Sequence, residues 1–231
     1  MTSKKSLILV TTIPITLKGI LIGQPKYLSS FYNILVVSSH DIELNQVGVD
    51  NGVNITPVKM ERGISPLKDM ISLCQMIKLF IKLKPDAVHS YTPKAGLITM
   101  LAGFLCGVPV RIHTFTGLIF PTNTGFKKII LKLMDTLICA CATTIVPESN
   151  GVKRDLLNNK ITSMEMQVIG HGNIAGVDTS YFSKEQVLTE SAEIKQKYNI
   201  QPSDFVFCFV GRFTQDKGFY ELLDAFYKLP E

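Results

Sequence analysis

The sequence predicts an α/β protein with a doubly wound, parallel, Rossmann-like sheet. Short apolar runs rich in β-branched residues recur along most of the chain, and segments with helical spacing separate them. Continuous apolar strands that alternate with helices of ten or more residues are typical of βαβ units, whose helices cover both faces of the sheet. With 46% hydrophobic residues and a formal net charge of only +5, the 231-residue chain has the composition of a folded protein, not a disordered one.

The first three strands are expected near the start of the chain. Residues 6–12 form a short apolar run with β-branched side chains, which predicts a buried strand. A glycine-bounded helix is expected at about 23–31, before a second β-rich run at 33–39. The Gly- and Asn-rich residues 47–54 predict a turn, and the third strand lies within 52–60.

The longest helix is expected in the middle of the chain. Pro66 occupies a first helical position, apolar residues then recur at three-and-four spacing, and Pro85 follows the end of the helix. Beyond it we expect a strand at 86–92, a helix at 94–106 and a strand at 108–117.

A helix at 126–141, a strand at 142–147 and a helix that Ser149 caps complete the first domain. In open parallel sheets, ligands bind beyond the carboxyl ends of the strands. A site is therefore expected among the segments that follow the strands, namely 11–19, 38–41, 89–96, 113–124 and 147–151.

The character of the chain changes after residue 170. We expect a first domain at 1–170, a glycine-containing linker at 171–186 and the start of a second α/β domain at 187–231. One strand and two helices bury too little apolar surface for a core of their own, so we expect weak order after Phe182. These three elements are a helix at 190–198, a strand at 205–210 and a helix at 219–228.

Cysteine use and hydropathy argue against a secreted or membrane-spanning chain. The five cysteines contain no Cys-x-x-Cys pair and read as reduced residues of a cytoplasmic protein. The first apolar run follows two lysines and so imitates a signal peptide, but Pro14 interrupts it and no small-residue cleavage site follows. The longest uncharged apolar stretch, 95–110, contains glycine and proline and is too short to span a bilayer.

Positive charge is concentrated in the first domain. Residues 187–231 carry five basic and seven acidic residues, so the excess of basic residues lies in 1–186. Lysines alternate with apolar residues on the helices expected at 66–84 and 126–141. These helices either dock on an anionic membrane surface or expose an ordinary solvated face. Nucleic acid is not an expected partner, since no recognition motif accompanies the charge.

The strongest local motif surrounds Gly211. An apolar run ends at this glycine, and Arg212 and Lys217 flank a short polar loop that opens a helix. Two cations beside the free N–H groups of a helix start suit a diphosphate, although a solvated turn with two surface cations has the same spacing. The loop lacks the Gly-x-x-x-x-Gly-Lys-Ser/Thr pattern of a Walker loop.

A second candidate follows the strand at 86–92. The strand ends at His89, Thr92 can cap the next helix, and Lys94 lies in the first turn of that helix. A cation there is disfavoured by the helix dipole unless an anion shares the site. Lys94 therefore either binds a phosphate or extends its amine into solvent.

A third candidate site lies at the end of the strand expected at 108–117. His113, Thr116 and Gly117 bring an imidazole, a hydroxyl and a flexible turn to the end of this strand. His113 either transfers or orients a proton near neutral pH or is a satisfied structural residue. No clustered set of His, Asp and Glu has metal-ligand spacing, so no metal is expected.

Several segments together resemble the family 4 glycosyltransferases, which have two facing Rossmann-like domains. The segments are HSYTPKAG, RIHTFTGLIF, VPESNGVK, GNIAGVD and VGRFTQDKG. The chain is most similar to bacterial enzymes that extend lipid-linked sugars for surface polysaccharides such as capsule and lipopolysaccharide. The resemblance implies a retaining transferase that needs no cofactor or metal and takes a nucleoside diphosphate sugar, expected to be a UDP-sugar, as co-substrate.

The resemblance also implies roles for the candidate residues. Gly211, Arg212 and Lys217 match the site for the donor diphosphate. The first domain would receive a polyprenyl-diphosphate-linked saccharide on the inner face of the cytoplasmic membrane. The residues expected to bind this acceptor are His89, Thr92, Lys94 and Gly117, and those expected to be catalytic are His113 and Thr116.

The sequence departs from the family pattern in two places. Many relatives have a histidine directly before the turn glycine, where this chain has Thr116, so His113 can take that role only if the strand turns early. The family's Glu-x7-Glu motif would lie beyond Glu231. A truncated fragment that binds acceptor or membrane without transfer is therefore an alternative, and a protein similar to nucleotide-sugar epimerases is another.

Overall fold

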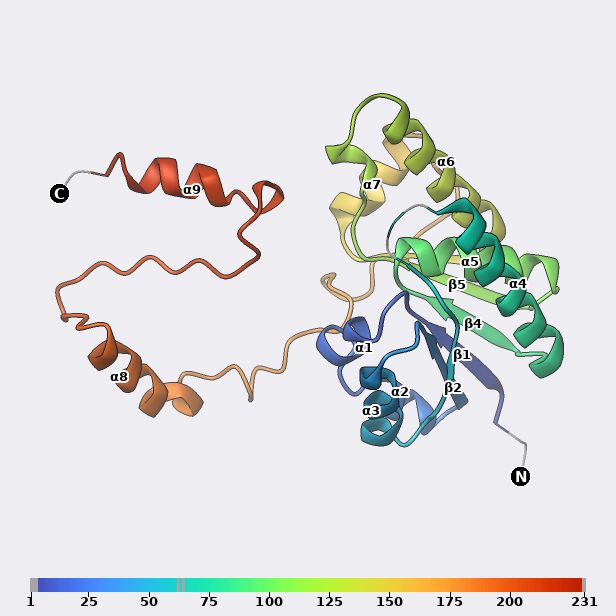
Figure 1. The fold of residues 1–231 in the computed structure, drawn as a ribbon, viewed down its shortest axis with the longest axis horizontal. Helices are drawn as coiled ribbons and strands as arrows, with labels where there is room; N and C mark the ends of the chain where they lie inside the picture. Colours follow the sequence, from blue (N-terminus) through green and yellow to red (C-terminus); the bar gives the residue numbers. More distant parts are fainter. Residues whose placement is uncertain (1–3, 62, 64, 230–231) are drawn as a thin grey trace. The chain divides into compact units, whose positions relative to one another are not determined.

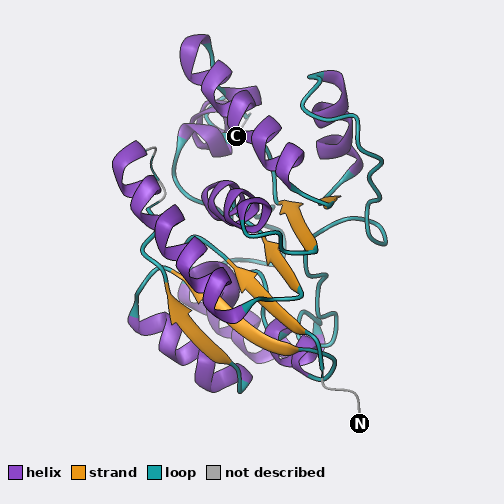
Figure 2. Ribbon diagram, turned by 90° about the vertical axis from the view of Figure 1, so that its right-hand side faces the viewer, coloured by secondary structure: helices purple, strands orange, loops and turns teal. Residues whose placement is uncertain are grey.

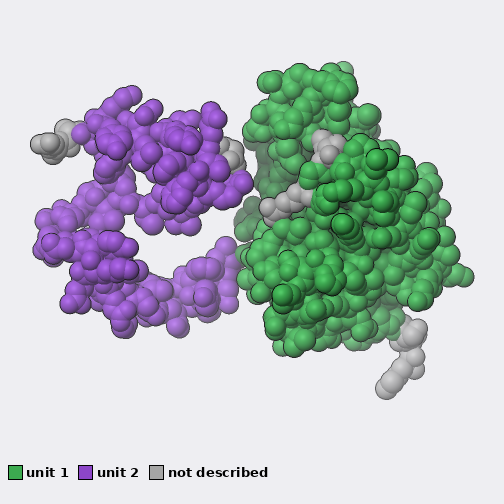
Figure 3. Space-filling view, in the orientation of Figure 1, with its two compact units in different colours: residues 1–176 green, residues 177–231 purple. Residues whose placement is uncertain are grey.

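The computed structural model describes residues 4–61, 63 and 65–229. The chain divides into two compact units, residues 1–176 and 177–231 (Figure 3). The boundary between them falls inside 171–186, the segment expected to be the linker.

Unit 1 contains a six-stranded sheet in the order β3-β2-β1-β4-β5-β6, and every pair of neighbouring strands is parallel (Figure 1). This is the strand order of the Rossmann fold, so the predicted fold class is confirmed. The strands are β1 (Ser6–Val10), β2 (Asn33–Ser38), β3 (Asn54–Pro57), β4 (Ala87–Ser90), β5 (Val110–Phe115) and β6 (Thr144–Pro147).

Helices lie on both faces of this sheet (Figure 2). The first half of the sheet is connected by α1, α2 and α3, the second half by α4, α5 and α6, and α7 follows β6; α5 packs against both α4 and α6. The bounds are α1 (Ile15–Gly19), α2 (Gln24–Ser29), α3 (Ile42–Asn51), α4 (Pro66–Leu83), α5 (Pro93–Leu105), α6 (Gly125–Cys141) and α7 (Asn150–Asn158).

Alternation along β1 divides the apolar core into two clusters. Ile8 and Val10 belong to the cluster that includes Phe80 of α4, whereas Leu9 belongs to the cluster that includes Leu44 of α3. Since successive side chains of a strand point to opposite faces, each cluster fills the space between one face of the sheet and its helices.

The turn expected at 47–54 is wrong in its first half, because α3 continues to Asn51. Leu44 and Val47, three residues apart, are the buried residues of this helix. Gly48 is required by packing: a Cβ at this position would lie 3.0 Å from the Ile55 side chain and 3.3 Å from a backbone oxygen of the next turn. In the sequence Gly48 resembles a turn residue, but in the structure it lets α3 approach Ile55 closely.

Two helix starts that the sequence predicts in unit 1 are confirmed. α4 begins at Pro66 as expected, and Ser149 caps α7 by accepting a hydrogen bond from the backbone N–H of Val152 at 3.2 Å. Among the described residues, no helix is both long and apolar enough to cross a membrane.

Unit 2 contains helices but no strand among its described residues. The helix α8 (Leu188–Lys197) and the helix α9 (Phe219–Phe226) lie close to their predicted positions, with short 3-10 turns at Glu185–Val187 and Gln215–Lys217. The strand expected at 205–210 is wrong: this segment pairs with no other described segment, and its first and last side chains are 84% and 90% exposed. A strand needs a neighbour to pair its backbone N–H and C=O groups, and this unit supplies none in the part described.

Candidate functional site

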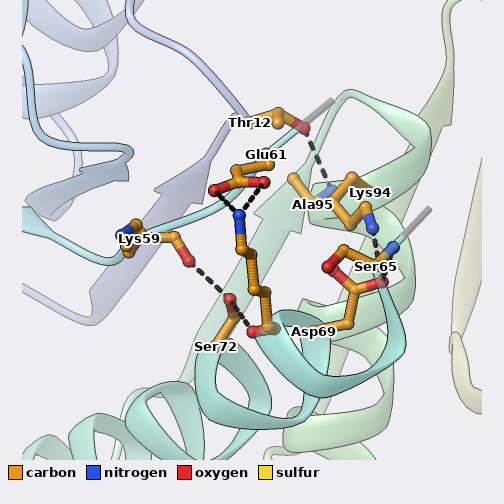
Figure 4. Close-up of polar contacts among 9 residues, drawn as sticks. Thr12, Lys59, Glu61, Ser65, Asp69, Ser72, Lys94 and Ala95 are labelled. Atoms are coloured by element: carbon orange, nitrogen blue, oxygen red, sulfur yellow. Dashed lines mark hydrogen bonds and ion pairs between the residues drawn. The ribbon is translucent and has the colours of Figure 1, made fainter. Parts of the chain in front are cut away.

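The strand order reverses between β1 and β4, which lie side by side while their following helices cover opposite faces. A crevice forms at such a switch point beyond the carboxyl ends of the strands. Two hydroxyls meet here: Thr12 Oγ1 and Thr92 Oγ1 are 2.6 Å apart, and the backbone N–H of Thr12 donates to Thr92 Oγ1 at 3.0 Å. The N–H of Ala95 donates to Thr12 Oγ1 at 3.3 Å (Figure 4). The side chain of Thr92 therefore does not cap its own helix as expected, because Thr12 binds the first turn of α5 instead.

Lys94 lies in the first turn of α5, as predicted, but its amine does not extend into solvent. The side chain is 5% exposed, and Nζ lies 2.5 Å from Asp69 Oδ2 of α4 (Figure 4). The anion that offsets the unfavourable helix dipole is thus a carboxylate of the same chain. The other oxygen, Asp69 Oδ1, is buried and has no hydrogen-bond partner among the described residues. The ammonium group has three N–H donors and Asp69 accepts one of them, so phosphate binding by Lys94 stays a prediction.

The first turns of α4 also hold the loop that follows β3. The Ser72 hydroxyl lies within hydrogen-bond distance of the carbonyls of both Lys59 and Lys68, which share its single proton, and Lys68 Nζ lies 2.8 Å from Glu61 Oε1 (Figure 4). The start of α4 therefore contacts this loop through Lys68 and Ser72, and contacts the start of α5 through Asp69. The arrangement fixes the position of Lys94 beside the switch point.

His89 lies within β4, where its ring is held on both sides. Nε2 lies 2.8 Å from Thr114 Oγ1, Nδ1 lies 3.1 Å from the Tyr91 hydroxyl, and the two rings stack with centroids 4.2 Å apart. The Tyr91 hydroxyl donates its proton to Gln24 Oε1 at 2.8 Å, so Nδ1 of His89 must donate to Tyr91 and Nε2 must accept from Thr114. Burial lowers the pKa of His89 to about 3, which keeps the ring neutral.

The exposed part of His89 faces a cavity of about 480 Å³. The lining of this cavity includes Ser6, Asp86 and Val110, which lie at the amino ends of β1, β4 and β5. His89 is the next-to-last residue of β4, but its ring packs against Tyr91 and lines this cavity. The expectation that it binds the acceptor receives no support from its position.

His113 is a core residue. It is 1% exposed, its Nδ1 lies 2.8 Å from Ser90 Oγ, and its ring meets Phe115 edge-on with centroids 4.6 Å apart. Burial lowers its pKa to about 3, and the nearby His89 adds to this effect. Because β5 continues to Phe115, the early turn that would bring His113 to the acceptor does not occur. These contacts favour the structural alternative for His113, and its catalytic role stays a prediction.

Thr116 and Gly117 follow β5 at the carboxyl edge, as expected, and both are half-buried. Gly117 has a φ of 120°, a conformation that L side chains rarely adopt. A Cβ at Gly117 would lie 3.7 Å from Oε1 of Glu148, the residue after β6. Glu148 lies within 147–151, a segment expected to follow a strand, but no motif in the sequence marks it as a site residue. Burial raises the pKa of its carboxyl above the ordinary value.

The donor-side candidates lie in unit 2, on the turn before α9. Arg212 and Lys217 are exposed, the backbone N–H of Lys217 donates to the carbonyl of Thr214 at 3.0 Å, and Gly218 adopts a left-handed conformation at the start of α9. Gly211 precedes this turn, as predicted. In the part of the chain that the structure describes, no group of three or more His, Cys, Asp or Glu side chains is placed to bind a metal.

A family model described as a glycosyl transferase 4-like domain matches residues 29–172, which is more than half of the chain and most of unit 1. The chain belongs to this family. The match covers β2 to β6 and the carboxyl-edge residues Thr92, Lys94, Thr116, Gly117 and Glu148.

Two curated relatives agree with the family. The chain is 37% identical over 197 residues to a capsular polysaccharide biosynthesis glycosyltransferase of Staphylococcus aureus, covering 84% of this chain and 50% of the relative. It is 31% identical over 160 residues to an Escherichia coli UDP-Gal:alpha-D-GlcNAc-diphosphoundecaprenol alpha-1,3-galactosyltransferase, covering 68% of this chain and 40% of the relative. The chain thus spans half or less of the length of these two relatives.

A solved structure of an Anabaena protein, in complex with UDP-glucose, superposes on this chain with a TM-score of 0.71 at 15% identity. The superposition covers 97% of this chain and 58% of the Anabaena chain. At this level of identity the likeness shows the fold.

Proposed function

We propose that the chain acts in a retaining glycosyltransferase that moves a hexose or N-acetylhexosamine from a nucleoside diphosphate sugar to a lipid-linked saccharide. The observation that carries this proposal is the family match, together with relatives named for capsule synthesis and for transfer to a diphosphoundecaprenol-linked sugar. The product would enter surface polysaccharide synthesis.

Unit 1 would bind the acceptor at the carboxyl edge of its sheet. The hydroxyl of Thr116 and the open turn at Gly117 lie beside the end of β5, where an acceptor sugar can approach the backbone closely. Lys94 would provide a cation for the acceptor diphosphate next to the switch point, through the N–H donors that its contact with Asp69 does not use.

Unit 2 would bind the diphosphate of the donor. Breaking the bond between sugar and diphosphate leaves an additional negative charge on the leaving group, which cations held nearby can stabilise. Arg212 and Lys217, on the turn that opens α9, are the residues proposed for this role, and a UDP-sugar is the proposed donor.

We also propose that α6 contacts the membrane that holds the acceptor. Its buried stripe includes Leu131, Asp135 and Ile138, so an ordinary solvated helix would be polar on the opposite side. Instead, that side has apolar side chains that are 38–76% exposed, and lysines lie on its flanks. The exposed apolar residues are Phe126, Ile129, Leu133 and Leu137, and the lysines are Lys127, Lys128 and Lys132.

Transfer can be tested with bacterial membranes that contain lipid-linked acceptor, a radiolabelled UDP-sugar and the purified chain. Label should enter the lipid fraction, and Arg212→Ala should slow transfer about a hundredfold, as removal of one transition-state donor does in other enzymes. Equal, nonzero transfer by both proteins would contradict the role of Arg212. Absence of transfer by the wild type would contradict the proposed activity.

Membrane contact can be tested separately by flotation with vesicles that contain anionic phospholipid. Reversing Lys127, Lys128 and Lys132 to Glu should weaken binding by at least a hundredfold, since each basic residue at the surface contributes about 1 kcal/mol. Reversal of three exposed lysines outside α6 provides a charge-matched control, namely Lys18, Lys26 and Lys195. Equal weakening by both sets would indicate that only net charge matters.

A further inference from the structure

The carboxylate of Glu148 is uncommitted, unlike those of Asp69 and Asp86. Asp69 forms an ion pair with Lys94, and Asp86 accepts hydrogen bonds from the hydroxyl and the N–H of Ser6, both at 2.7 Å. Among the described residues, no hydrogen-bond donor or cation contacts the carboxylate of Glu148. This acid is nevertheless half-buried, at the carboxyl edge of the sheet.

The backbone of Glu148 is held from two directions. Its N–H donates to the carbonyl of Phe115 at 3.1 Å, which continues the pairing of β5 and β6, and its carbonyl accepts from the N–H of Asn173 at 2.7 Å. The loop passes so close that a Cβ on Gly172 would lie 2.8 Å from the Glu148 carbonyl oxygen. A fixed backbone therefore carries a side chain that has no partner within the described structure.

The space beside this carboxylate is kept free by Gly117. Oε1 of Glu148 lies 3.7 Å from the position that a Gly117 Cβ would take, so a side chain longer than alanine at 117 would compete for the same region. Thr116, the neighbouring hydroxyl, is half-buried at the same strand end. A hydroxyl-bearing ligand that reaches the end of β5 would meet a carboxylate acceptor there.

We propose that the Glu148 carboxylate accepts a hydrogen bond from a hydroxyl of the acceptor's terminal sugar and so orients that sugar at the end of β5. The inference rests on the proposed function, since it assumes that unit 1 receives a lipid-linked saccharide. An ionised carboxylate has only acceptor sites, which suits a ligand rich in O–H donors, and hydrogen bonds to a charged group are about twice as strong as neutral ones.

Titration calorimetry of the whole chain can test this with two probes, farnesyl diphosphate and farnesyl-diphosphate-linked N-acetylglucosamine. The wild type should prefer the sugar-bearing probe. The preference is the ratio of the affinities for the two probes. Glu148→Gln should lower this ratio about tenfold and Glu148→Ala should abolish the preference, while the affinity for farnesyl diphosphate stays unchanged. Glu165→Gln, which removes the charge of an exposed acid of the same unit, is the matched control.

The outcomes separate the two proposals. An undiminished preference for the sugar-bearing probe in Glu148→Ala would overturn the role of Glu148 while leaving acceptor binding intact. A wild type that binds neither probe would overturn acceptor binding and, with it, the role of Glu148. A thermal unfolding scan of each variant distinguishes a structural role, because an uncommitted carboxylate predicts less than about 1 °C change in Tm on conversion to Gln.

Discussion

The substitution Gly96→Ala tests whether His113 is the fixed core residue that the structure describes. A Cβ added at Gly96 would lie 2.4 Å from Cε1 and 2.8 Å from Nδ1 of His113. The imidazole cannot move aside easily, because Ser90 holds it at 2.8 Å and Phe115 packs against it edge-on. Overpacking of a buried site costs about 1–3 kcal/mol, and the better helix propensity of alanine offsets up to about 1 kcal/mol.

Urea and thermal unfolding of the variant should therefore show a net loss of about 1–2 kcal/mol, or roughly 2–8 °C in Tm for a unit of this size. Gly19→Ala is the control, since no atom lies within 4 Å of its added Cβ, and it should leave stability unchanged or slightly increased. The decisive step is a double-mutant cycle with His113→Ala, in which the loss caused by Gly96→Ala should largely disappear. If Gly96→Ala lowers the free energy of unfolding equally with and without the imidazole, the proposed contact is refuted. The result would then be compatible with a solvent-facing His113.

Further predictions concern titration and order. Burial raises the pKa of Asp135 from 3.8 to about 7, so the folded state retains a proton that the unfolded state releases; stability should fall by up to about 4 kcal/mol as pH rises from 4 to 7. Asp135→Asn should therefore stabilise the chain at pH 8 but not at pH 4, in urea titrations, and equal effects at both values would contradict a buried acid. Because burial also raises the pKa of Glu148 above 4.5, any affinity that depends on its carboxylate should weaken as pH falls toward 4, and calorimetry of Glu148→Gln should show no such loss. Hydrogen exchange should find amides 205–210 unprotected in the isolated chain, since they pair with no strand in the described structure, whereas strong protection would show that they do.

Strands such as β1 and β2 could be predicted because they are short apolar runs that are mostly buried, which leaves a clear signal in local sequence. The same signal failed at 205–210, where an apolar run lacks a neighbouring strand. The end of α3 was missed for a related reason. Gly48 reads as a turn residue, but its role is to let the helix approach Ile55 closely, and sequence alone does not show that contact.

The site could be predicted at the level of segments but not of side chains. The rule for parallel sheets selects the ends of β4, β5 and β6 as places to search, and the structure brings Lys94, Thr116 and Glu148 to those ends. The orientation of His113 depends on where β5 ends, which the sequence left open. The partner of Lys94 is Asp69, which lies 25 residues earlier in the sequence. Glu148 is of interest because its carboxylate has no partner among the described residues. Such features follow from tertiary packing and have no local signature.

The most direct test of the proposed acceptor site is to locate the bound probe on unit 1. Amide NMR of the chain titrated with farnesyl-diphosphate-linked N-acetylglucosamine can distinguish the two ends of the sheet. Binding at the carboxyl edge predicts the largest shift changes at Thr12, Thr116, Gly117 and Glu148. Changes centred instead on Val110 and the other residues that line the cavity at the amino ends of the strands, or no changes at all, would contradict it.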